Sequence, residues 1–196
     1  MGSTFDGFPA VTRARSRTTA RAHWCGSAPH SSLSRLYCAF ILYAWRPSIV
    51  PEIWQPGRQA ELLKRLEALR PETRAAWGKF TPARMLAHCA DAMRAGLGEL
   101  PVKPKPGPLR SWPLRKLLIY VAPWPKGAPT APELIPEGDP DFETAKGELR
   151  SALVRFVTAG PAGKFAEHAA FGALTGKDWG ALTYRHLDHH WRQFGL

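Results

Sequence analysis

The stretch WGALTYRHLDHHWRQF, residues 179–194, decides the fold because it reads as one amphipathic helix. At about 100° per residue, a stripe of roughly 120° collects seven side chains that we expect to face a core. These are Trp179, Leu182, Thr183, His186, His190, Gln193 and Phe194. The same phase points Asp188 and Trp191 away from the core and leaves His189 on the rim. Two imidazoles, one helical turn apart, are therefore predicted to face inward.

Histidines at positions i and i+4 of a helix can hold one divalent ion, and imidazole suits zinc, nickel or iron(II). A third ligand must come from another helix, and His88 is the candidate because it adjoins an apolar face of its own helix. Three protein ligands leave open positions for water or substrate. The spacing alone leaves open that His186 and His190 are satisfied core residues or part of a solvated helix end. Because ligand imidazoles must be neutral, metal affinity is expected to fall toward about pH 6.5 and below.

The rest of the sequence also predicts helices, and so an all-α protein. Leucines recur at helical spacing after residue 59, and Thr81-Pro82 and Asp139-Pro140 are start signals, since threonine caps helices and proline fits a first turn. Helices are predicted over residues 59–69, 81–98, 139–160 and 176–194. Between the second and third lies a long proline-rich crossover, residues 101–140, with a short helix over residues 113–121. Two tryptophans of the crossover, Trp112 and Trp124, are candidates for the mouth of a pocket.

Residues 1–50 differ from the rest of the chain. They hold six arginines and one acid, and so supply +5 of the net charge of +11. We expect them to lie outside the folded domain, which we place at residues 51–196. They fit a transit-like leader, a disordered basic tail or, the alternative we favour, translated upstream sequence from a misplaced start.

Composition restricts the compartment and the partners. The 3 cysteines form no CxxC pair, so a reducing, cytoplasmic location is expected. No apolar run reaches the ~18 residues of a membrane span, so no membrane partner is expected. Nucleic acid is not expected either, because no helix face interleaves aromatic with basic residues. We expect a small-molecule substrate and leave a homodimer open.

Two segments carry a resemblance to a known family. Residues 77–91, WGKFTPARMLAHCAD, resemble the second-helix signature of the DinB/YfiT-like superfamily. Residues 168–195 end in H-x-x-x-H-x-x-Q and resemble the last-helix signature of the same superfamily. More narrowly, residues 53–196 look like the group known as DUF1569, with a loose match through the crossover. The resemblance implies a DinB-like four-helix bundle with a long crossover, and a metal site made by His88, His186 and His190.

The resemblance also implies a function. Related proteins include thiol-dependent transferases and isomerases, so we expect a metal-dependent thiol transferase or hydrolase that acts on a small electrophile. A low-molecular-weight thiol is the implied second cofactor. Asp91, one turn beyond His88, is expected to orient an imidazole or act as a base, and Gln193 to bond to a ligand or to bound water. The alternatives are a non-enzymatic metal or small-ligand binding protein, and a nucleic-acid binder working through residues 1–50.

Overall fold

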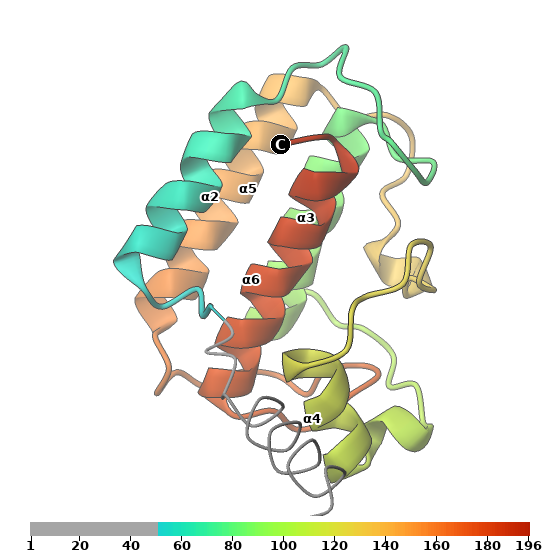
Figure 1. Cartoon of the computed structure of the whole chain (residues 1–196), viewed down its shortest axis with the longest axis vertical. Coiled ribbons are helices and arrows are strands. Elements are labelled where there is room, and N and C mark those ends of the chain that lie inside the picture. Colours follow the sequence, from blue (N-terminus) through green and yellow to red (C-terminus); the bar gives the residue numbers. More distant parts are fainter. Residues whose placement is uncertain (1–50) are drawn as a thin grey trace, which may run out of the picture. The chain divides into compact units, whose positions relative to one another are not determined.

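A computed structural model of the chain describes residues 51–196, and the predictions made for residues 1–50 lie outside this range. The described residues form five α-helices and two short 3-10 helices, and no β-strand (Figure 1). The α-helices are α2 (Pro56–Ala68), α3 (Pro82–Leu97), α4 (Trp112–Tyr120), α5 (Phe142–Ala159) and α6 (Gly176–Gln193). The 3-10 helices are η1 (Pro108–Arg110) and η2 (Pro132–Leu134). None of the helices in residues 51–196 has the length and apolarity that crossing a bilayer would need.

The helix ends follow from capping residues. The Thr81 side chain accepts from the backbone N–H of Arg84 at the start of α3, and Gly98, at φ 78°, ends the helix in the left-handed region. The helix α5 begins two residues later than Asp139-Pro140 predicts. Its cap is Asp141, whose carboxylate accepts from the N–H of Thr144 at 2.8 Å. That carboxylate satisfies one of the N–H groups in the first turn, which have no partner within the helix.

The four long helices run side by side, with α3 packed along α5 and α6 in contact with α2, α3 and α4 (Figure 1). Leucine, methionine and aromatic side chains fill the space between them. The largest fully buried members include Trp191, Phe156, Leu62, Leu66, Met85, Leu86, Leu149 and Leu187. The apolar faces predicted for the long helices are therefore the faces that make the core.

The buried surface of α6 is wider than the sequence predicts. Trp191 was expected to point outward, but it is only 1% exposed, and its indole Nε1 donates to the carbonyl of Leu62 at 2.9 Å. The prediction was wrong because it assumed one core-facing stripe, whereas α6 has α2 on one side and α3 on the other. Asp188, as predicted, stays at the surface and pairs with Arg65 on α2 at 2.8 Å.

The crossover is held against α6 by two sets of polar contacts, both involving the C-terminal half of α4. The Arg185 guanidinium donates to the carbonyls of Leu118, Ile119 and Ala122, at the C-terminal end of α4. A cation there also complements the negative end of the helix dipole. Near the start of α6, the buried carboxylate of Asp178 accepts from the side chains of Lys116 and Tyr120. These contacts fix where the rest of the crossover passes over α6.

Close packing at the N-terminal part of α6 gives a stability prediction. A Cβ on Gly180 would lie 2.2 Å from Nε1 of Trp54, whose ring stacks on Phe156 at 5.4 Å. Gly180→Ala should therefore lower the free energy of unfolding by about 1–3 kcal/mol, despite the better helix propensity of alanine. Gly147→Ala is the matched control, since Gly147 is an exposed α5 glycine with no neighbour within 4 Å. Urea unfolding of both variants tests this, and a Gly180→Ala protein as stable as wild type would contradict the packing.

Candidate metal centre

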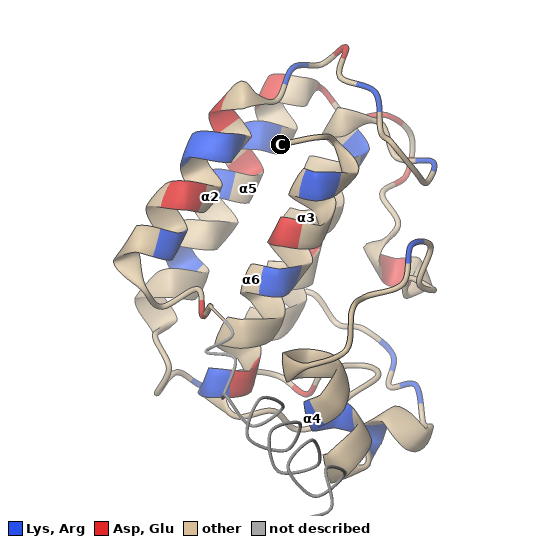
Figure 2. Ribbon diagram, viewed as in Figure 1, with Lys and Arg blue, Asp and Glu red and all other residues tan. Residues whose placement is uncertain are grey.

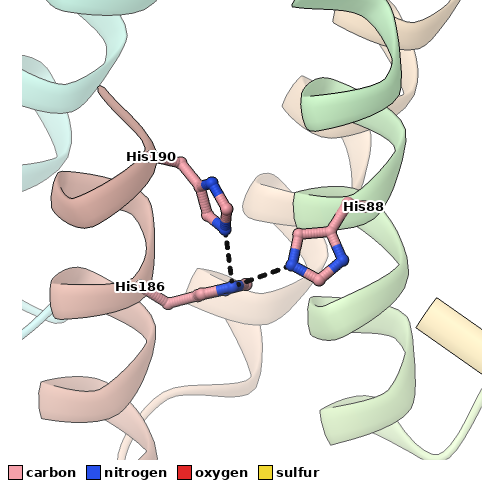
Figure 3. Close-up of side chains that lie close together, drawn as sticks. All are labelled: His88, His186 and His190. Atoms are coloured by element: carbon pink, nitrogen blue, oxygen red, sulfur yellow. Dashed lines mark hydrogen bonds between the residues drawn. The ribbon is translucent and has the colours of Figure 1, made fainter. Parts of the chain in front are cut away.

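Three histidine side chains from two helices meet between α3 and α6 (Figure 3). Nε2 of His186 lies 3.1 Å from Nε2 of His88 and 3.2 Å from Nε2 of His190. His88 and His190 are buried, at 4% and 8% exposure, and His186 is partly exposed. The structure thus brings together the three histidines that the sequence singled out as ligands.

The placement of this trio, His88, His186 and His190, follows from the helix phases. His186 and His190 are one turn apart on α6, so their side chains leave the same face. His88 leaves the buried face of α3 that also carries Met85 and Cys89. The N-terminal end of α3 meets the C-terminal end of α6, as the hydrogen bond from Gln193 to the Trp77 carbonyl shows.

The orientation of His88 is fixed from the crossover. Its Nδ1 lies 2.7 Å from the carbonyl oxygen of Leu134, in η2. A carbonyl oxygen can only accept a hydrogen bond, so Nδ1 of His88 is the donor. In the neutral imidazole the lone pair then lies on Nε2, the atom that faces the other two histidines.

The orientation of His190 is fixed by Gln193, which the sequence placed next to the ligands. Nδ1 of His190 lies 2.8 Å from Oε1 of Gln193, and Nε2 of Gln193 donates to the Trp77 carbonyl at 2.7 Å. The Trp77 carbonyl determines which way the amide points, because only the NH2 group can donate to it. Oε1 must therefore accept from His190, and the lone pair of His190 lies on Nε2.

Burial keeps the three imidazoles neutral. It lowers the pKa of His88, and with the neighbouring histidines it lowers the pKa of His186 well below 6.5. Burial, followed by the repulsion from His88, lowers the pKa of His190 to about 3. Neutral imidazole is the form that binds a metal ion, so at neutral pH no proton has to leave these side chains first.

The structure does not place Asp91 against an imidazole nitrogen. Its carboxylate accepts from Arg94 at 2.9 Å, and Arg94 also pairs with Glu148 of α5 at 3.3 Å. Nδ1 of His88 is held by the carbonyl of Leu134. Asp91 acts on His88 only through its charge, which raises the pKa of that histidine against the larger effect of burial.

Two other side chains with metal-binding chemistry, Cys89 and His168, are structural. The Cys89 thiol is fully buried and donates to the sulfur of Met85 at 3.8 Å, and burial raises its pKa, so it is a core residue and not a thiolate ligand. Nδ1 of His168 accepts from the backbone N–H groups of Ala170 and Phe171, both at 3.2 Å, and so orders its loop.

Aromatic rings close around the trio. The ring of Phe80 lies 5.2 Å from His88 and 6.2 Å from His190, and the ring of Trp124 lies 6.1 Å from His186. Of the two tryptophans expected at a pocket mouth, Trp124 is therefore next to the site, whereas Trp112 lies on α4 and is 67% exposed. Neither Phe80 nor the Leu134 carbonyl could be assigned to the site from the sequence.

The comparisons with known proteins place the chain in a family without a described function. Residues 58–195 match the family described as protein of unknown function (DUF1569). No curated protein matches the chain, and no solved structure matches it. The family match covers most of the sequence, including all five α-helices apart from the first two residues of α2. The chain therefore belongs to the DUF1569 family.

Proposed function

We propose that this protein is a divalent-metal enzyme on a DinB-like four-helix bundle, with His88, His186 and His190 as the ligands. The reaction we propose is thiol transfer or hydrolysis on a small electrophile. The helices α2, α3, α5 and α6 supply the bundle, and the crossover supplies the Leu134 carbonyl that orients one ligand.

One observation carries the proposal: the hydrogen-bond pattern leaves lone pairs that face one another. Nε2 of His88 and Nε2 of His190 are both acceptors, and both lie within 3.2 Å of Nε2 of His186. His186 has at most one hydrogen on that atom, so it cannot donate fully to both neighbours. A cation between the three nitrogens satisfies all of them, and an unsatisfied buried acceptor costs about 1–3 kcal/mol.

The donor set favours particular metals. Three neutral imidazole nitrogens are borderline ligands that suit zinc, nickel or iron(II), and they do not suit calcium or magnesium, which prefer oxygen. Three protein ligands from two rigid helices leave at least one coordination position for an exogenous molecule, as catalytic sites do.

When bound, such an ion supplies a nucleophile at neutral pH by lowering the pKa of a water molecule or of a low-molecular-weight thiol. The chain's own residues orient the ligands and shield the metal position. Leu134 and Gln193 hold two imidazoles in the ligand tautomer, and Phe80 and Trp124 shield the nitrogens from bulk water.

The proposal is tested in two steps. Elemental analysis of protein purified without a histidine tag should find about one zinc, nickel or iron per chain. The loaded protein is then assayed with small thiols and electrophiles, such as an epoxide or an activated alkene, against a chelated control. A stoichiometric metal with no metal-dependent turnover would favour a non-enzymatic metal-binding protein, and the absence of metal would end the proposal.

The Gln193 contact gives a prediction about affinity. Gln193→Leu removes the acceptor of His190 Nδ1–H, so that imidazole loses its fixed tautomer, and metal affinity should fall by about 10–100-fold. Competition with a chromophoric chelator measures the change. Gln59→Leu is the matched control, since Gln59 also donates to a backbone carbonyl, that of Ile53, but lies on α2 away from the site. Equal affinity in the Gln193 variant and wild type would contradict the role of Gln193.

A further inference from the structure

Positively charged side chains lie over the faces of the aromatic rings near the trio. Each of three rings has one positive group over it, at 6.0 Å or less from the ring centre. The pairs are Arg84 over Phe80 at 6.0 Å, Arg185 over Trp124 at 5.4 Å and Lys126 over Trp77 at 4.5 Å. Phe80 and Trp124 contact the trio directly, and Trp77 contacts the adjacent His189 at 5.8 Å.

The acidic groups nearest the trio on the two helices are already paired. Asp91 is paired with Arg94, and Asp188 is paired with Arg65 and Arg192. The crossover, residues 101–140, has an excess of positive charge, because it contains six lysines and arginines but only three acidic residues, Glu133, Glu137 and Asp139 (Figure 2). The crossover therefore has a net positive charge even before a metal ion is counted.

Of the three ring-bound cations, Lys126 is the one available to a ligand. Arg185 donates to three carbonyls of α4, and Arg84 donates to the carbonyl of Pro136. Lys126 is exposed, and within the described part of the chain its ammonium has no ion-pair partner. It lies at the edge of the site, since Trp77 and Trp124 both contact His189 and the Trp77 carbonyl holds Gln193.

We infer that the site takes an anionic ligand, and that Lys126, held on the Trp77 ring, attracts it. This inference rests on the metal centre proposed above. Three neutral imidazoles leave the double charge of a divalent ion without compensation, so an anion in the open position gains from the ion and from the cations around it. A neutral or cationic ligand lacks this gain.

The test uses cobalt(II)-loaded protein and azide as the probe. The visible bands of cobalt(II) report exchange of ligands at the ion, and elemental analysis of the same samples reports cobalt per chain. Lys126→Gln should weaken azide binding by about three- to tenfold at low ionic strength, and Lys126→Glu by more. The affinity of the wild type should also decline with added salt. Lys79→Gln is the matched control, since Lys79 is another exposed lysine, two residues from Trp77.

The outcomes separate the two proposals. Equal azide affinity in wild type and both Lys126 variants, at one cobalt per chain, would overturn the role of Lys126 while the metal centre stands. An azide affinity that Lys79→Gln lowers as much as Lys126→Gln would overturn it too, because the effect would then reflect net charge. A wild-type protein that binds no cobalt would overturn the metal centre and this inference with it.

Discussion

Replacing His186 with alanine is expected to empty the metal centre while the fold survives. Binding of a structural zinc ion is worth about 10–16 kcal/mol, so one of about four ligands is worth roughly 3 kcal/mol, which is more than a hundredfold in affinity. His88→Ala and His190→Ala should have the same effect, although His88 lies on a different helix. Elemental analysis of the purified variants, after dialysis against a weak chelator, measures metal per chain.

His189 is the internal control for this experiment. It neighbours His190 in sequence, at 5.4 Å between ring centres, but its imidazole packs between Trp77 and Trp124 and is not one of the three converging side chains. His189→Ala should therefore keep its metal. A site that His189→Ala empties and His186→Ala does not would mean that the ligand assignment is wrong. Metal content unchanged in all four variants would mean that the histidines are structural.

The fold should not need the metal ion. The core consists of leucine, methionine and aromatic side chains from all four long helices, whereas the trio replaces only a few apolar contacts between α3 and α6. The ligand variants should therefore unfold cooperatively, and circular dichroism in the presence of chelator measures this. A ligand variant without a cooperative transition would show that the effect on metal content reflects unfolding.

Local patterns in the sequence were enough to predict the helices and to place His186 and His190 on one helix face. Each helix end depends on residues within one turn of it, such as Thr81 and Gly98 for α3. The His186/His190 pair is equally local, because helix periodicity alone puts both on one face. The position of His88 is not local. The apolar face of its own helix made it the candidate third ligand, and the resemblance to a known family, supported by the DUF1569 match, implied the same residue.

The contacts that complete the site could not be predicted, because they depend on where the crossover lies. A backbone carbonyl such as that of Leu134 has no signature in the sequence, since every residue carries one. The position of the crossover depends on the contacts that Arg185 and Asp178 make with α4. These contacts join residues that lie more than fifty positions apart in the sequence. Trp191 was misplaced for the same kind of reason, because the arrangement of α2 and α3 around α6 is a property of the whole fold.

The structure also changes the expected response to acid. From the ordinary histidine pKa of about 6.5, metal affinity was expected to fall as the pH approached that value. In the folded protein the pKa of His190 is about 3, because its imidazole is buried. Protons therefore compete little for His190 in the folded protein at mildly acidic pH, and metal affinity should fall less between pH 7 and 5 than an ordinary histidine pKa predicts.

The metal-free protein should lose stability steeply as the pH falls below 6.5. The unfolded chain binds a proton at His190 near pH 6.5, and the folded chain does so only near pH 3. The stability that neutral His190 contributes is thus fully present above pH 6.5. It declines as the pH falls toward about 3, by up to about 1.4 kcal/mol per pH unit. His190→Leu should remove the part of the slope that comes from His190, whereas the parts from His88 and His186, whose pKa values are also lowered, should remain. Thr183→Val, at a buried α6 position without a titratable group, should keep the whole slope. Urea unfolding at several pH values between 7 and 5 measures the slopes, and identical slopes for wild type and His190→Leu would mean that the folded protein already carries a proton on His190.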